Sequence, residues 1–143
     1  VCSSDLIIIR ISGQVGILRV NSFTIFGEPA SKANSRKAVL IGGRPRFIKS
    51  KKALAYVKTF DSQCPVLDDL ITEDVKVEMI IYYASRRPDL DESLILDCMQ
   101  NKIYANDRQV KQKMIYWQLD RENPRTIIRV SECDINNIIN INI

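Results

Sequence analysis

The 143-residue chain contains no histidine. A Ser-His-Asp triad, a Cys-His nucleophile pair and any histidine-ligated zinc site are therefore excluded. The four cysteines are scattered without a Cys-x-x-Cys pair, at Cys2, Cys64, Cys98 and Cys133. We interpret them as small buried apolar residues in a reducing compartment, because neither a disulfide framework nor a zinc cage fits their spacing.

The sequence also lacks a long hydrophobic run. No apolar stretch approaches the roughly 18–20 residues that a membrane-spanning helix needs. No basic segment followed by an apolar one marks a secretory signal. These absences predict a cytoplasmic protein with no membrane partner.

Both ends of the chain have unusual sequences. The opening VCSSDL resembles translated sequencing-adapter read-through, so we expect residues 1–6 to be a non-native leader. The closing NNIINININI is of low complexity, and we expect residues 132–143 to form a tail. The functional domain is then expected to occupy residues 7–131.

The composition fits one compact domain, since 45% of the residues are hydrophobic and can form a core. Charge is unevenly distributed. The segment from Lys32 to Lys58 holds nine Lys or Arg and no Asp or Glu, so it carries +9. Because the whole chain carries +4, the remaining residues carry −5. A basic arm joined to an acidic remainder indicates a polyanionic partner and a separate carboxylate-rich site.

Hydrophobic patterning predicts four strands and a hairpin. The clearest strand has strictly alternating apolar positions and runs over Val75–Tyr83. The other strands are expected at Ser22–Phe26, Val110–Leu119 and Thr126–Val130. Gly42 and Gly43 predict the turn of a hairpin formed by residues 38–41 and 46–49.

Two helices are expected between these strands. Ser50 can cap a helix that runs to about Gln63, with an apolar stripe of Leu54, Val57 and Phe60. Asp91 can cap a second helix over Glu92–Asn101. Together the elements predict an α+β fold, a single domain with a mixed or antiparallel sheet and about two helices.

Three aspartates form the candidate metal site. Asp89 and Asp91 lie two residues apart directly after a predicted strand, so in an extended chain their side chains point the same way. Asp107 begins another predicted strand, and the helix between can return the chain to the pair. Two adjacent carboxylates repel unless a cation separates them, and Mg²⁺ prefers oxygen ligands. The alternative is a solvated loop, because Asp-x-Asp pairs are common on surfaces.

Further residues surround this candidate site. Arg86 and Arg87 precede the aspartates and can reach phosphate. Asp97 lies in the second predicted helix, where it is either a ligand or supporting partner of the metal or a plain surface acid.

The segment RPDLDESLILDCMQNKIYANDRQV resembles the RusA family of Holliday junction resolvases, whose pattern runs from PDxDN through an LDAL-type helix to DD-Q-[IV]. The segment GEPASKANSRKAV resembles the family's G-x-P-x-x-K-x-N-x-R region, and the likeness spans about Phe23 to Val130. It implies a homodimeric, Mg²⁺-dependent endonuclease (Mn²⁺ being an alternative ion) that resolves four-way DNA junctions in a bacterial or phage-infected cell. By position, Asp89, Asp91 and Asp107 match the catalytic and metal-binding aspartates, and Asn106 stands where many members have another aspartate.

The sequence departs from the family pattern at two positions. Glu92 replaces the usual Asn, and Ile95 stands where the family has a functional lysine. The interval from Asp91 to Leu96 is also two residues short. Lys102, Arg108 and Lys111 are open candidates for the missing cation.

The basic arm is expected to bind DNA through phosphate contacts. The candidates are Lys32, Arg36, Lys37, Arg44, Arg46, Lys49, Lys51 and Lys52. A lysine-rich solvated face is the plainer interpretation. For Phe47 we expect a core position rather than insertion at a junction centre.

Of three other functions, one is discounted and two are open. Pro88-Asp89 superficially suggests a PD-(D/E)xK restriction-type core, but we discount this class because no acid-x-Lys follows at a suitable distance. A non-catalytic module that binds branched DNA is compatible with the missing lysine. A purely structural phage protein would show no preference for branched DNA.

Overall fold

The computed structural model describes the backbone of residues 2–11, 14–31 and 36–133, and side chains from residue 21 onward within these ranges. A five-stranded sheet has the order β1-β2-β7-β5-β6, and β3 and β4 pair separately. The strands are β1 (Cys2–Ile11), β2 (Gln14–Phe26), β3 (Arg36–Ile41), β4 (Arg44–Lys49), β5 (Val75–Tyr83), β6 (Val110–Leu119) and β7 (Arg125–Glu132). The helices are α2 (Lys51–Gln63), α3 (Ser93–Cys98) and the 3₁₀ turn η1 (Asp107–Gln109).

The large sheet is mixed, as the sequence predicts. β5 pairs antiparallel with β7 and parallel with β6, while β2 joins β1 and β7 antiparallel. A parallel pair needs a long crossover, and the β5–β6 crossover, residues 84–109, contains α3, η1 and all three candidate aspartates. The α+β prediction is confirmed.

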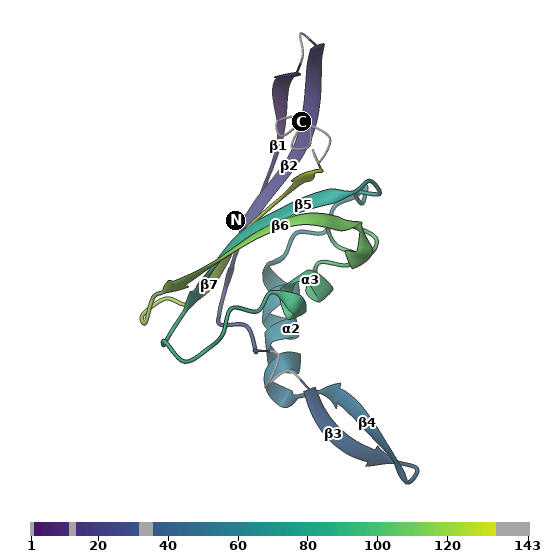
Figure 1. Ribbon diagram of the computed structural model, residues 1–143, viewed down its shortest axis with the longest axis vertical. Coiled ribbons are helices and arrows are strands. Elements are labelled where there is room, and N and C mark those ends of the chain that lie inside the picture. The colour runs from purple at the N-terminus through teal and green to yellow at the C-terminus, as the bar shows by residue number, and fades with distance from the viewer. Residues whose placement is uncertain (1, 12–13, 32–35, 134–143) are drawn as a thin grey trace, which may run out of the picture.

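The core lies between one face of the sheet and the helices, which cover the same side (Figure 1). Alternate residues of β5 are buried throughout, and Ile128 and Val130 of β7 join them. From α2 the buried residues are Ala53, Tyr56 and Phe60. The predicted stripe was wrong at Leu54, which is exposed, because it lies about a quarter-turn around the helix from Ala53.

The helix boundaries follow local hydrogen bonds. α2 begins after Ser50, whose side chain accepts the Ala53 N–H at 3.2 Å, as predicted. The second helix is shorter than the predicted Glu92–Asn101. It ends at Cys98, and Asn101 adopts the left-handed region with φ 64°, which helical backbone does not tolerate.

The β3–β4 pair forms a ribbon that projects past the N-terminal end of α2, away from the large sheet (Figure 1). Its turn is Gly42-Gly43, with φ of 60° and 78°, values that favour glycine in a two-residue hairpin turn. The predicted hairpin is confirmed. Phe47, expected in the core, is 76% exposed on this ribbon, so that prediction was wrong.

Two further expectations concern the cysteines and the membrane. Cys64 and Cys98 are buried outside any disulfide, as predicted, whereas Cys133, also predicted to be buried, is only half-buried. Within the described ranges, no helix is long and apolar enough to cross a membrane. The predicted tail falls almost entirely outside the described residues.

Candidate active site

The loop that follows β5 is fastened to the sheet by Tyr83 and Trp117. The two rings stack with centroids 5.7 Å apart. The Trp117 indole donates to the Pro88 carbonyl at 3.0 Å. The Tyr83 hydroxyl donates to the Asp89 carbonyl at 3.2 Å and accepts the Asp91 N–H at 3.3 Å. Burial raises the pKa of Tyr83, which keeps the hydroxyl protonated as a donor.

Asp91 has one carboxylate oxygen engaged and one unpaired. Oδ1 accepts the Ser93 N–H at 3.0 Å and the Ser93 hydroxyl at 2.7 Å. Oδ2 is buried without a hydrogen-bond partner. A buried carboxylate oxygen without a partner is unfavourable, so it fits a site that receives a cation.

A cavity of about 810 Å³ lies beside this loop. Its lining combines four carboxylates with two cations and a few small or apolar residues. The lining residues are Glu28, Pro29, Ser31, Lys52, Ser85, Arg87, Pro88, Asp89, Leu90, Asp91 and Glu92. Asp89 and Asp91 therefore both line this one cavity.

The other two carboxylates of the cavity have structural partners. Glu28 accepts the Ala84 N–H at 2.9 Å, which ties the end of β2 to the end of β5. Glu92 pairs with Lys113 of β6 at 2.6 Å. Sequence reasoning missed Glu28, although its GEP context was recognised, because only the fold brings residues 28 and 84 together.

Asp107 occupies a separate place at the start of η1. Its backbone N–H donates to Gln100 Oε1 at 3.0 Å. Asn106 caps this turn through the Arg108 N–H, and Gln109 donates to the carbonyl oxygens of Ile71 and Glu73 at 2.7 and 2.9 Å. Asn106 and Gln109 thus hold the backbone on either side of Asp107.

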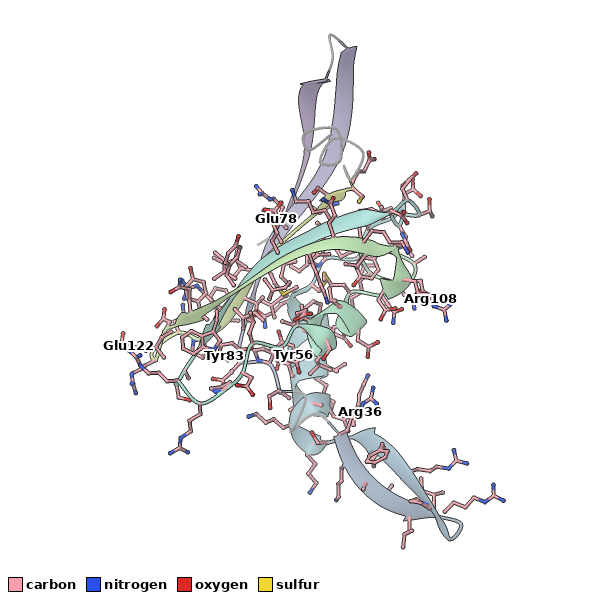
Figure 2. The ribbon with its side chains drawn as sticks, in the orientation of Figure 1. Arg36, Tyr56, Glu78, Tyr83, Arg108 and Glu122 are labelled. Atoms are coloured by element: carbon pink, nitrogen blue, oxygen red, sulfur yellow. The ribbon has the colours of Figure 1, made fainter. Side chains whose placement is uncertain are left out.

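The structure does not group Asp107 with the other two aspartates. Asp107 is absent from the cavity lining. It adjoins the start of β6, which pairs with the start of β5, whereas Tyr83 ends β5. Tyr83 and Arg108 accordingly lie toward opposite ends of these strands (Figure 2). Within the described part of the chain, no three Asp, Glu or Cys side chains are placed to hold one metal ion.

Asp97 connects the basic ribbon to the neighbourhood of Asp107. Its carboxylate pairs with Lys49 at 3.3 Å and accepts the Gln100 side-chain amide at 3.1 Å. Gln100 in turn accepts the Asp107 N–H. Asp97 does not line the cavity.

The predicted DNA-binding cations fall in three places. Arg36, Lys37, Arg44, Arg46 and Lys49 lie on the ribbon, Lys51 and Lys52 lie in the first turn of α2, and Arg86 and Arg87 lie in the loop after β5. Lys32 is outside the described residues. Of this set, Lys52 and Arg87 also line the acidic cavity.

The chain matches the family described as endodeoxyribonuclease RusA over residues 27–131. The chain belongs to the RusA family. The matched residues include the cavity loop, η1 and the basic ribbon, and membership identifies a DNA endonuclease of a family that resolves Holliday junctions. No individual curated protein matches the chain.

The position of the RusA-family lysine is occupied in this chain by a residue of the hydrophobic core. Ile95 is fully buried in α3. Lys102, one candidate replacement, pairs with Asp61 at 2.7 Å and lies against α2. Lys52 and Arg87 are the described cations that face the cavity of Asp89 and Asp91.

Proposed function

We propose that this RusA-family chain is a Mg²⁺-dependent endonuclease that resolves four-way DNA junctions by paired nicks, with Mn²⁺ as a substitute ion. The observation that carries the proposal is the unpartnered, buried Oδ2 of Asp91, a residue that lines one cavity together with Asp89. Carboxylate oxygens are the ligands that Mg²⁺ takes together with water and phosphate.

Asp89 and Asp91 would hold the ion. A metal bound there supplies a water of lowered pKa and neutralises charge on the scissile phosphate. Tyr83 and Ser93 contribute by fixing the backbone and one carboxylate oxygen of Asp91. Asp107 is the third catalytic residue of the proposal, and it can join the pair only if the crossover between β5 and β6 rearranges.

Lys52 is proposed as the cation that takes the place of the missing family lysine. It is exposed at the first turn of α2 and lines the same cavity as both aspartates. An ammonium group there can stabilise the charge that develops on the phosphate. Arg87, in the loop after β5, lines the cavity as well and can hold a neighbouring phosphate.

We also propose a homodimer, which would place two sites on a junction of roughly twofold symmetry. The support is the face of the large sheet that the helices leave uncovered. It exposes Met114, Tyr116 and Ile127, next to a shallow hollow lined in part by Ile80. Such an apolar patch is typical of a protein contact. Sedimentation at micromolar concentration should give twice the mass of the chain.

The deciding experiment is cleavage of a synthetic four-way junction with Mg²⁺. Asp89→Asn and Asp107→Asn should bind the junction and fail to nick it. Asp69→Asn is the matched control, because Asp69 is exposed and outside the cavity. If Asp89→Asn and Asp107→Asn cut as fast as the parent, the assignment of these aspartates is wrong.

A second candidate function is a non-catalytic module that binds branched DNA. The burial of Ile95 at the family lysine position favours it. Single-turnover assays separate the two functions. Junction binding without nicking in either Mg²⁺ or Mn²⁺ would establish the module and exclude the nuclease.

A further inference from the structure

The β3–β4 ribbon has two chemically different faces. In an antiparallel pair, directly opposed residues share a face and successive pairs alternate between faces. One face is formed by the pairs Ala38–Phe47 and Leu40–Pro45, with Arg36–Lys49 at its base. The other face is formed by the pairs Lys37–Ile48, Val39–Arg46 and Ile41–Arg44. The outer part of the first face is therefore wholly apolar, while each pair of the second carries a cation.

The apolar face is open to solvent. Phe47 and Leu40 are each 76% exposed, and the rest of the described chain does not cover them. The ribbon does not pair with the large sheet, and it projects from the body of the protein, where its side chains point outward (Figure 2). An aromatic and a leucine held this far from the core contribute little to folding. Their position indicates contact with a partner.

Charge identifies the class of that partner. The segment from Arg36 to Lys49 carries five cations and no acid. A second ribbon of the same charge would be repelled, whereas a polyanion is attracted. A two-stranded ribbon also has the dimensions that a DNA groove admits. Nucleic acid offers phosphates to the cationic face and, wherever stacking is interrupted, base surfaces to the apolar face.

We propose that Phe47 and Leu40 contact unstacked bases at the branch point of the junction, while Arg44, Arg46 and Lys37 contact the flanking phosphates. This inference rests on the proposed junction substrate. An intact duplex has its bases stacked on each other, so Phe47 gains a base surface only by opening a step. A branch point already interrupts stacking. The apolar face therefore supplies the preference for branched DNA, and the cationic face supplies affinity for any DNA.

The test measures binding of a four-way junction and of a duplex of the same sequence in Ca²⁺ or EDTA, so that cleavage does not interfere. Phe47→Ala should weaken junction binding about tenfold, as expected for the loss of one base–aromatic stack, and leave duplex binding unchanged. Ile41→Ala is the matched control, since Ile41 is 52% exposed on the cationic face of the same ribbon. It should change the ratio of junction to duplex affinity by less than twofold.

A second readout locates the contact. 2-Aminopurine at the branch point should change its fluorescence on binding of the parent, and this change should be lost with Phe47→Ala and kept with Ile41→Ala. If Phe47→Ala retains the junction preference and the fluorescence change, the inference is wrong while the proposed function stands. If the parent itself binds and nicks junctions no better than duplex, the proposed function fails as well.

Discussion

The backbone N–H of Asp91 donates to the phenol oxygen of Tyr83 at 3.3 Å, and the same hydroxyl donates to the carbonyl of Asp89. The Tyr83 side chain thus forms hydrogen bonds with the backbones of both candidate metal ligands. Tyr83 is the last residue of β5 and is 1% exposed. The loop therefore takes its position from a strand whose alternate side chains are all buried.

Tyr83→Phe should remove both hydrogen bonds between β5 and this loop while keeping the ring stacked on Trp117. The variant leaves the Asp91 N–H without a partner, so we expect a loss of about 1 kcal/mol in the free energy of unfolding. Junction cleavage should fall by more than junction binding. Urea denaturation and single-turnover cleavage measure the two effects. Tyr82→Phe, at the adjacent tyrosine on the opposite face of β5, should alter neither.

Lys52→Ala should slow cleavage on the order of 10²-fold, because one charge-stabilising group would be missing from the transition state. Junction affinity should change little by comparison. Lys51→Ala is the natural control, since Lys51 is also exposed in the same helical turn but does not line the cavity. Equal cleavage rates for the two variants would assign the missing cation elsewhere, with Arg87 the next residue to replace.

The double variant Arg44→Ala/Arg46→Ala should lower the log–log dependence of DNA affinity on salt by about two units, since each phosphate contact contributes close to one. Both arginines lie on the cationic face of the ribbon. Arg121→Ala, in the exposed turn between β6 and β7, should leave the slope unchanged. An unaltered slope in the double variant would show that DNA binds away from the ribbon.

The lowered pKa of Glu78 is expected to make the fold less stable in acid. Burial acts to raise the pKa of its carboxyl, but hydrogen bonds from Arg129 and Lys76 outweigh burial and hold the pKa below its ordinary value of 4.5. A carboxyl with a lowered pKa in the folded state stabilises the protein above that ordinary value. This contribution is lost as pH falls through the folded pKa.

The melting temperature of the parent should therefore drop between pH 5 and pH 3 by more than that of Glu78→Gln. Glu122→Gln, in an exposed turn, is the control and should follow the parent. Parallel melting curves for the parent and Glu78→Gln over this range would contradict the assignment.

Elements with a strong local signal could be predicted from the sequence. The alternation of β5, the cap at Ser50 and the Gly42-Gly43 turn depend on neighbouring residues, and all three are found. The second helix was predicted too long because tertiary contacts determine where it ends. The Tyr104 hydroxyl, for instance, donates to the Leu96 carbonyl at 2.5 Å, within that helix.

Only those residues of the candidate site that are neighbours in the sequence could be predicted. Asp89 and Asp91 are close in sequence and share a cavity. The partners Glu28, Lys52 and Trp117 come from three other segments of the chain, so no local pattern links them to the aspartates. Phe47 was placed in the core because a phenylalanine in a strand is usually buried. Phe47 is exposed instead, because the β3–β4 ribbon does not pack against the core.

The position of β7 has a consequence for synthesis of the protein. β7 is made last among the named strands, yet it lies between β2 and β5 in the middle of the sheet. Until it emerges from the ribosome, the β1–β2 hairpin and the β5–β6 unit have no strand to join them. A polypeptide halted before residue 125 would hold every candidate catalytic aspartate on an unsupported half-sheet. The order of synthesis thus delays assembly of the sheet that supports these aspartates until β7 has been made.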